Sequence, residues 1–434
     1  MGEPMSEDKF DAIIVGGGIA GAVTALQLAR AGLEVVLVER GNYAGAKNMT
    51  GGRLYSHSLE KILPGFAENA PIERKVVKEK ISMMTGTGGL TMDFGSDKLV
   101  QEKQDSYTVL RAPFDRWLMD QAEAAGAMVV TGILVEELLM QDGRVKGISA
   151  GGEEMLADVV VLADGANSLL VEKAGLRKHR IEAHQIAVGA KEVIELDEQL
   201  IEERFNLNPG EGAAWLFAGF PSDGLIGGGF LYTNKSSISL GLVVTLSEFN
   251  KAQKTLPQML EDFKQHPHVA PLIRGGKLVE YSGHLVPEGG YDMIPDLYGD
   301  GVLVAGDAAA LVINAGYTVR GMDLAVGSAD AAAQTIIAAK EKNDFSSASL
   351  SQYKTLLENS FVIQDMKQLR KFPHFMENSR IFNEYPQMVE EMMSSLFVVN
   401  GSAPQSLLSK MLKPARKVGL MNLIKDGIKG VRAL

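Results

Sequence analysis

A glycine-rich turn near the N-terminus constrains the fold of this 434-residue chain more than any other feature. The apolar run FDAIIV at 10–15 is typical of a buried parallel strand, and GGGIAG follows it directly. The next segment, AVTALQLARAG, has apolar residues at helical spacing, and LEVVLVE indicates a second buried strand that ends at Glu39. Strand, glycine turn, helix and strand in this order predict a βαβ unit.

The turn matches the G-x-G-x-x-G pattern of dinucleotide-binding proteins. Gly16 permits a tight turn, Gly18 lets the backbone approach a pyrophosphate, and Gly21 lets the helix pack closely on the strand. The pyrophosphate is then expected at the helix N-terminus, where free N–H groups favour an anion. An acid at the end of the second strand accepts from a ribose hydroxyl and disfavours the 2′-phosphate of NADP. The expected contacts in this unit are Gly16, Gly18, Ala20, Gly21, Glu39 and Arg40.

Further segments along the chain favour FAD over NAD. A plain NAD dehydrogenase continues with regular βα units, whereas separated polar segments suit a longer cofactor. Asp307 is expected to accept from a ribityl hydroxyl, and a helix start near Thr318 to stabilise negative charge at flavin N1–C2=O. Each segment alone is equally compatible with a turn or an ion pair, but their order and spacing together indicate a cofactor. The residues expected to bind it are Lys47, Asn48, Arg53, Arg111, Val135, Asp164, Gly165, Gly306, Asp307, Gly316, Thr318 and Val319.

The remaining pattern predicts a chain of mixed α/β class with a discontinuous nucleotide-binding domain. Residues 9–185 are expected to form its first part and 291–340 its closing part. Between them, 186–290 is β-rich with turn glycines and is predicted to be an inserted antiparallel sheet that binds substrate. Residues 341–434 are predicted to be helical.

Composition excludes several classes of site. The chain contains no cysteine, so it holds no disulfide, no cysteine nucleophile, no zinc–thiolate site and no iron–sulfur cluster on its own thiolates. The histidines are scattered without metal-ligand spacing, and we predict no metal site. The net charge of −11 argues against nucleic-acid binding.

Charge is unevenly distributed along the chain. Residues 401–434 contain seven basic side chains and one acid, Asp426, so this tail is +6 and the rest of the chain −17. A basic, partly amphipathic tail suits an anionic membrane or a partner surface, and a solvated closing helix is equally compatible. No 18-residue apolar window and no secretory signal are present, so we expect a cytoplasmic protein, peripheral at the inner face of the cell membrane.

The fingerprint, Arg111 with its FDRWL helix, and the Asp164-Gly165 and Gly306-Asp307 pairs resemble the glutathione-reductase-type flavoprotein superfamily. The segments GAKNMTGGRLYSHSLEKILPGF, GGGFLYTN, LEDFKQHPHVAPLIRGGKLVEYSGHLVPEGG and NLIKDG are similar to the FixC branch of the electron transfer flavoprotein:quinone oxidoreductase family. The resemblance runs from about Lys9 to the C-terminus. It implies a non-covalent FAD in a Rossmann domain that takes electrons from an electron transfer flavoprotein and passes them to a membrane quinone.

The resemblance also implies a quinone site and a further partner. Gly227, Gly228 and Phe230 match the strand that lies at the quinone in larger members, although tight strand packing also uses glycine. Those members carry a ferredoxin-like domain with four cysteines around a [4Fe–4S] cluster, and this chain has none. In the FixC branch the ferredoxin is a separate polypeptide, so a ferredoxin-like iron–sulfur partner is expected.

Three other functions remain open at this level. An isoprenoid reductase of the geranylgeranyl type uses the same FAD fold, and so does an aromatic monooxygenase. The hydroxylases have Arg after the Ser that follows Asp-Gly, but Leu169, Leu170 and Val171 follow Ser168 here, which weakens the monooxygenase hypothesis. The third alternative is a non-catalytic flavoprotein scaffold in an electron-transfer complex. No catalytic side chain is predicted beyond the flavin.

Overall fold

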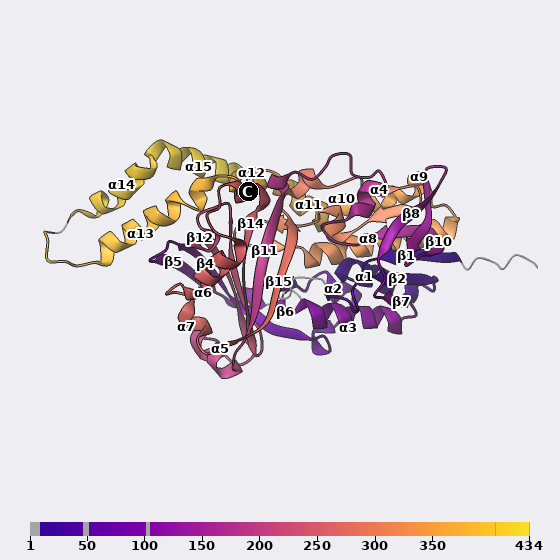
Figure 1. Ribbon diagram of the computed structural model, residues 1–434, viewed down its shortest axis with the longest axis horizontal. Helices are drawn as coiled ribbons and strands as arrows, with labels where there is room; N and C mark the ends of the chain where they lie inside the picture. The colour runs from indigo at the N-terminus through magenta and orange to yellow at the C-terminus, as the bar shows by residue number, and fades with distance from the viewer. Residues whose placement is uncertain (1–8, 47–51, 101–104, 404, 434) are drawn as a thin grey trace, which may run out of the picture.

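The computed structural model describes residues 9–46, 52–100, 105–403 and 405–433, and its elements gather around two β-sheets that lie side by side (Figure 1). The first sheet contains the N-terminal strand, and the second is built mainly from the middle of the chain. The predicted mixed α/β class is therefore confirmed.

The first sheet has eight strands in the described part of the chain, and its centre is parallel. β1 lies between β10 and β2, and its residues 12–15 are at most 4% exposed. Such an apolar strand suits a parallel sheet that is covered on both faces. In order across the sheet the strands are β16 (Tyr298–Gly299), β17 (Val302–Val304), β10 (Glu153–Leu162), β1 (Lys9–Val15), β2 (Val35–Glu39) and β7 (Met128–Thr131), with the hairpin β8 (Val135–Gln141) and β9 (Arg144–Ala150) attached to β10.

Three long helices pack with this sheet. They are α1 (Ile19–Arg30), α3 (Arg111–Ala124) and α8 (Met322–Lys342). α1 contacts both α3 and α8, and it starts directly after the glycine turn, as predicted. The shorter α2 (Leu59–Ile62) and α4 (Leu169–Lys173) lie in the connections, and the two-stranded ribbon β18 (Ile313–Asn314) and β19 (Val319–Arg320) precedes α8.

The second sheet has nine strands in the described part of the chain. In order they are β15 (Lys277–Pro287), β11 (Ile186–Glu195), β14 (Ser237–Thr245), β13 (Gly227–Thr233), β12 (Glu211–Gly219), β4 (Ile72–Met84), β6 (Ser106–Val109) and β3 (Gly52–Tyr55), with β5 (Gly89–Gly95) attached to β4. The helices α5 (Glu198–Phe205), α6 (Leu256–Gln265) and α7 (Ala270–Ile273) belong to this unit. Phe263 of α6 packs against Phe217 of β12, so α6 covers one face.

The second sheet also takes strands from before residue 186. We grouped 52–109 with the first part of the nucleotide-binding domain, and four strands of this segment complete the second sheet. The junction is a parallel pairing of β4 with β12, from Glu211 opposite Lys75 to Gly219 opposite Met84. Pairing between strands so distant in sequence leaves no local signal in either strand.

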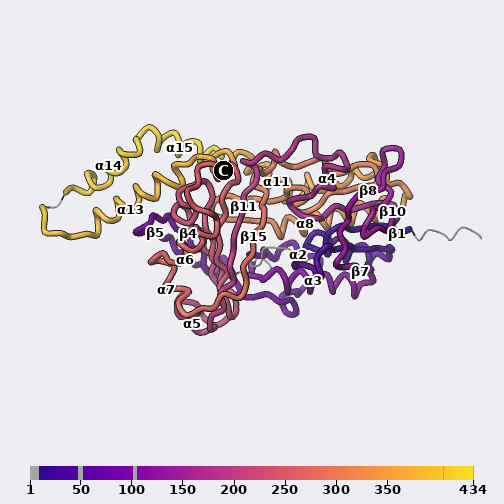
Figure 2. The backbone as a smooth tube through the Cα atoms, viewed as in Figure 1, coloured from indigo at the N-terminus to yellow at the C-terminus, as the bar shows by residue number. Residues whose placement is uncertain are grey.

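The last part of the chain is helical, as predicted. The helices are α9 (Ser347–Leu350), α10 (Gln352–Glu358), α11 (Phe361–Gln368), α12 (Phe372–Met376), α13 (Glu384–Phe397), α14 (Leu407–Val418) and α15 (Leu420–Ala433). α13 and α14 pack on each other, and α13 also contacts β4 and β5. The far end of this helix pair projects beyond the second sheet, whereas α15 returns to α12 (Figure 2). Among the described residues, no helix combines the length and the apolar character that crossing a bilayer requires.

Candidate functional site

A cavity of about 750 Å³ runs between the two sheets and is lined by segments from across the whole chain. It extends from the ends of β1, β2 and β10, past the start of α3, to the β18–β19 ribbon and the inner face of the second sheet. Most of the residues predicted from the sequence line it. They are Gly16, Gly18, Ala20, Glu39, Arg40, Arg53, Arg111, Val135, Asp164, Gly165, Gly227, Gly228, Phe230, Gly306, Asp307, Gly316 and Val319.

The glycine turn forms one end of this cavity, and its backbone packs tightly against its neighbours. A Cβ atom on Gly16, whose φ is +104°, would lie 2.4 Å from the carbonyl oxygen of Ala163 at the end of β10. A Cβ on Gly21 would lie 1.9 Å from the carbonyl oxygen of Gly16, so Gly21 serves helix packing and does not line the cavity. The free N–H groups at the start of α1 therefore face the cavity without side chains in the way.

Glu39 shapes the turn as well as the cavity wall. Its two carboxylate oxygens accept from the backbone N–H of Gly17 (2.7 Å) and of Gly41 (2.6 Å). The side chain is 8% exposed and lines the cavity. A buried carboxylate at the end of β2 is where a ribose hydroxyl is bound in dinucleotide sites.

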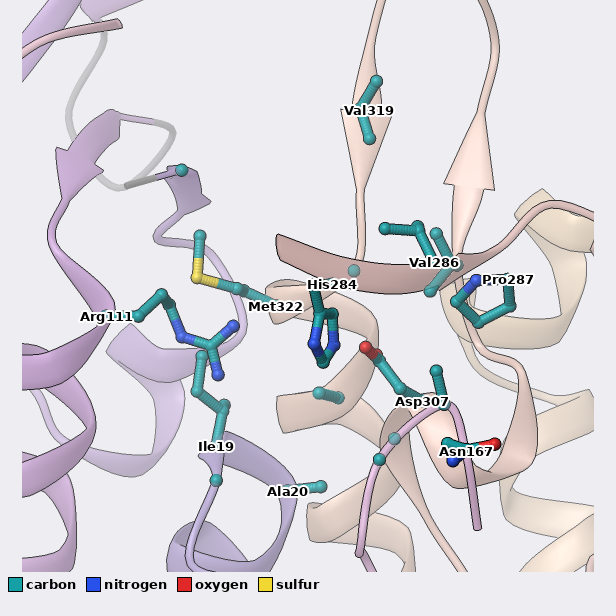
Figure 3. A pocket seen from close by; sticks show the side chains of 18 of the residues that line it. Ile19, Ala20, Arg111, Asn167, His284, Val286, Pro287, Asp307, Val319 and Met322 are labelled. Carbon is teal, nitrogen blue, oxygen red and sulfur yellow. The ribbon is translucent and has the colours of Figure 1, made fainter. Parts of the chain in front are cut away.

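Charged groups meet in the middle of the cavity (Figure 3). Arg111, at the start of α3, makes a two-pronged ion pair with Asp115, with both N–O distances at 2.8 Å. In Figure 3 the imidazole of His284 lies between the guanidinium of Arg111 and the carboxylate of Asp307. Burial raises the pKa of Asp307, and Arg111 and His284 counter that rise. Burial also lowers the pKa of His284, which keeps the ring neutral.

Two acids, Asp164 and Asp307, follow the ends of neighbouring strands of the first sheet, β10 and β17. Burial raises the pKa of Asp164, and its Oδ1 has no hydrogen-bond partner among the described residues. Gly306, directly before Asp307, has a φ of +62°, and a Cβ there would lie 2.8 Å from the Cβ of Ala20. The two strand ends therefore offer carboxylate acceptors to a ligand in the cavity, at a point where the side chain of any residue other than glycine at position 306 would contact Ala20.

The far end of the cavity lies against the second sheet. Gly316, Val319 and Met322 approach from the ribbon and the start of α8, opposite the sheet residues Phe230 and Val243. The start of α8 turns its N-terminal dipole toward this end, where negative charge is stabilised. On the sheet, a Cβ on Gly227 would lie 2.2 Å from the carbonyl oxygen of Val243, and one on Gly228 2.6 Å from that of Phe217. These two glycines both line the cavity and allow tight strand packing.

Besides Gly21, three predicted residues are not among those described as lining this cavity. Lys47 and Asn48 lie outside the described residues. Thr318 hydrogen-bonds the phenol of Tyr55 and lines a neighbouring cavity of about 820 Å³, which shares Arg53, Ile81 and Arg320 with the first. The neighbouring Gly316 and Val319 line the first cavity, so the two cavities meet at this ribbon.

The sequence reasoning missed Glu288 as a cavity residue, and it singled out His284, beside His57, only as a histidine that could assist protonation of a quinone. The segment HLVPE places His284, Val286 and Glu288 at a spacing of two, which puts side chains on one face of a strand. That alternation was the available signal. Lys191 was missed as well: it is 0% exposed on β11, and its amine has no hydrogen-bond partner among the described residues.

These features fit FAD. The cavity is long, it has a glycine cradle at a helix N-terminus for a pyrophosphate, and it presents buried acids for ribose and ribityl hydroxyls. A second helix N-terminus lies at its far end, where the flavin ring carries charge after reduction.

Three family models match the chain. Residues 11–104 match "FAD dependent oxidoreductase", residues 186–286 match "ETF-QO, ubiquinone-binding", and residues 372–434 match "ETF-QO/FixC family C-terminal domain".

Curated relatives match nearly the whole length. The chain is 56% identical to "Protein FixC" of Salmonella typhi, over 99% of this chain and all of the relative. It is equally similar to "Probable electron transfer flavoprotein-quinone oxidoreductase YdiS" of Escherichia coli, with the same coverage. "Protein FixC" of Azorhizobium caulinodans is 42% identical over 92% of each chain.

Solved structures share the fold at low identity. A geranylgeranyl bacteriochlorophyll reductase-like protein from Thermoplasma acidophilum superposes with a TM-score of 0.70 and 20% identity, over 96% of this chain and 99% of that one. The flavin-dependent brominase Bmp2 gives a TM-score of 0.66 at 16% identity, over 94% of this chain and all of that one. The fold, the cavity and the full-length relatives agree: this chain is an FAD-dependent oxidoreductase and belongs to the ETF-QO/FixC family.

Proposed function

We propose that this protein takes electrons from an electron transfer flavoprotein onto its FAD and passes them to a membrane quinone. The observation that carries the proposal is the shared cavity: Gly227, Gly228 and Phe230 line the same space as the dinucleotide fingerprint. They lie in the segment that matches a ubiquinone-binding model. A flat quinone ring placed there lies at the same end of the cavity as the start of α8.

The chain's own residues have distinct parts in this proposal. The glycine turn and the start of α1 bind the pyrophosphate, Glu39 and Asp164 the adenosine half, and Arg111 with Asp307 the ribityl chain. The FAD supplies the electron transfer itself. The protein then sets the orientation of the flavin, its potential and the access of quinone to it.

The proposal includes a separate ferredoxin-like iron–sulfur protein. Thiolates hold such clusters, and this chain has no cysteine to offer. A relay that uses a cluster therefore needs a second polypeptide.

The C-terminal hairpin supports contact with a membrane. Phe397, Val398 and Val399 are 79%, 65% and 93% exposed at the end of α13, and Leu407 and Leu408 are 65% and 67% exposed at the start of α14. These apolar side chains lie at the projecting end of the hairpin, away from both sheets (Figure 1). The basic residues of the tail add attraction to anionic lipid at about 1 kcal/mol each near the surface. We place the protein at the inner face of the cell membrane on this basis.

Anaerobic turnover tests the electron path. Reduced electron transfer flavoprotein is mixed with the FAD-loaded protein and a short-chain quinone, and quinol formation is followed by absorbance. Catalytic, protein-dependent quinol formation is expected. Saturation of a prenyl double bond, or substrate-dependent consumption of O₂ and NAD(P)H, would show the reductase or monooxygenase alternative instead. If no electron donor reduces the bound flavin, the result would favour the alternative of a non-catalytic flavoprotein scaffold.

Vesicle flotation tests the membrane contact. The double variant Leu407→Gln/Leu408→Gln removes apolar side chains that are already exposed, so it leaves the fold intact. It is expected to weaken binding to anionic vesicles at low ionic strength. The matched control is Leu246→Gln, at an exposed leucine of the second sheet unit. Equal binding by both variants and the unmodified protein would contradict the proposed hairpin contact.

A further inference from the structure

Glu288 is a carboxylic acid in the cavity wall that the electron path described above does not use. It follows β15 directly, lines the cavity, and is partly buried. Its backbone N–H donates to the carbonyl of Gln185 (2.7 Å), which fixes the main chain at this point. The hydroxyl of Thr245 donates to its Oε2 at 3.0 Å.

The hydrogen bonds of Glu288 connect the two sides of the cavity. Thr245 ends β14, and its backbone N–H donates to the carbonyl of Ile226 (3.0 Å), the residue before Gly227. The side chain of Asn314 also hydrogen-bonds Glu288, and Asn314 Oδ1 accepts from the N–H of Gly316 (3.0 Å). Glu288 is thus tied on one side to the strand of the proposed quinone site. On the other side it is tied to the loop at the proposed flavin ring.

The charged groups around Glu288 have partners of their own. On the neighbouring short helices, His184 pairs with Glu182, Glu248 with Lys251, and Asp292 with Arg370. On α12, His374 pairs with Glu377 and Lys371 is exposed.

In the same cavity, three further titratable groups near the flavin end interact with other residues. Arg320 pairs with Asp323 and Asp365. Asp307 and His284 act on each other's pKa. Among the described residues, no cation is paired with Glu288, and burial raises its pKa although Thr245 and Asn314 partly oppose the rise.

We propose that Glu288 is the acid that protonates the quinone as it is reduced. This inference rests on the proposed function. Reduction of a quinone to a quinol takes two electrons and two protons, and both electrons come from the reduced FAD. The O–H bond of Glu288 breaks as an O–H bond forms on a quinone carbonyl oxygen. The second proton is the one that a reduced flavin releases on oxidation, and Glu288 regains its proton from water.

His284 is less suited to this task than Glu288. Figure 3 places its ring beside the carboxylate of Asp307, and burial disfavours its protonated form. A neutral imidazole accepts a proton more readily than it donates one. A carboxylic acid whose pKa is raised by burial is the better donor.

The variant Glu288→Gln tests the proposal because it keeps the size and polarity of the side chain but carries no transferable proton. Assays of the FAD-loaded variant with two electron acceptors separate electron transfer from proton transfer. Reduction of a short-chain quinone needs protons and is expected to fall by roughly 100-fold. Reduction of a ferricenium salt needs electrons alone and is expected to stay within about twofold of the unmodified protein.

The pH dependence of quinone reduction distinguishes a proton donor from a residue that only supports the structure. Quinone reduction by the unmodified protein is expected to decline as pH rises through the pKa of Glu288, because the acid loses its proton. In Glu288→Gln this decline is expected to disappear, and Glu288→Asp is expected to restore part of the rate. The matched control is Glu248→Gln, a buried carboxylate that pairs with Lys251 and does not line the cavity.

Infrared difference spectroscopy detects the protonated carboxyl group directly and does not require turnover. The holoprotein is expected to show the carbonyl band of a protonated carboxylic acid that is absent from Glu288→Gln and present in Glu248→Gln. Full quinone activity in Glu288→Gln, or loss of both acceptor activities together, would overturn the role of Glu288 and leave the proposed function standing. An unmodified protein that reduces no quinone would overturn the proposed function and this role with it.

Discussion

Arg380 donates two hydrogen bonds to the carboxylate of Asp426, at 2.7 and 2.8 Å, and so joins the loop before α13 to helix α15. Tyr385 donates to the same carboxylate. Asp426 is the acid that the basic tail contains, and its side chain is 4% exposed. The hydrogen bonds from Arg380 hold the pKa of Asp426 well below its usual range.

We predict that Asp426→Asn releases α15 from the body of the protein. A two-pronged bond to a charged group contributes about 1.5–3 kcal/mol, so amide hydrogen exchange in α15 is expected to accelerate by one to two orders of magnitude. Because the folded pKa is depressed, the stabilisation is present above about pH 4 and disappears as the pH falls below that value. Lys417→Gln, which removes the exposed pair with Glu391, is the control and should leave the exchange in α15 unchanged.

A second prediction concerns Gly306, which lines the cavity close to Ala20. Gly306→Ala places a Cβ 2.8 Å from Ala20 and forces a side chain onto a φ of +62°. We expect the purified protein to contain much less FAD, as measured by the ratio of flavin to protein absorbance. Gly143→Ala is the matched control, because Gly143 has a φ of +80° and open space around its Cβ position. It costs about 1–2 kcal/mol of backbone strain but should keep the FAD content. Equal loss of FAD in both variants would mean that backbone strain alone is responsible.

A third prediction concerns the ion pair at the start of α3. Asp115 is 0% exposed and orients Arg111 in the cavity. Asp115→Asn leaves a buried guanidinium without its counter-charge, and we expect it to lower the free energy of unfolding by about 3 kcal/mol. FAD affinity, measured by titration of the apoprotein with FAD, should fall as well because Arg111 loses its orientation. Asp120→Asn, on the exposed face of the same helix, should change neither quantity. An unchanged FAD affinity in Asp115→Asn would contradict the orienting role.

A fourth prediction follows from Lys191. Burial lowers its pKa to about 7, far below that of a lysine in an unfolded chain. Between about pH 7 and 10 the unfolded chain binds a proton at this position that the folded chain lacks, so stability rises with pH across this window. Lys191→Met removes the penalty and is expected to stabilise the protein by up to about 5 kcal/mol at pH 7, with the gain vanishing near pH 10.

Denaturant unfolding at pH 7 and at pH 10 measures this difference. Lys178→Met, at an exposed lysine that pairs with Asp296, is the control. A gain from Lys191→Met that does not depend on pH would show that Lys191 keeps its charge in the folded protein.

Local patterns predicted the nucleotide-binding part of the site well. The glycine turn, the acid at the end of β2 and the Gly306-Asp307 pair all arise from short-range geometry, in which a strand end, a turn and a helix start are adjacent in sequence. Each of these segments lines the cavity. Their assembly could be anticipated because parallel strands bring their carboxyl ends to one edge of a sheet.

The second sheet was harder to predict. The sequence of β4, IERKVVKEKISMM, mixes short charged and apolar runs and does not indicate its partner. It pairs in parallel with β12, which begins at Glu211. Glu288 and Lys191 were missed for a related reason. An acid or a lysine in a strand is usually solvated, and its burial depends on which distant elements cover that face.

The strand order of the first sheet has a consequence for how the protein is made. β10 pairs with β1 on one side and with β17 on the other, and β17 follows some 140 residues later in the chain. At a synthesis rate of about 5–20 residues per second, the nascent chain waits on the order of ten seconds with one edge of its central sheet unpaired. The cradle for FAD includes Gly306, which comes after β17, so the cofactor can be captured only when more than two thirds of the polypeptide has been translated. Until then the unpaired edge of β10 is open to wrong strand partners, and this interval is where a chaperone has most to protect.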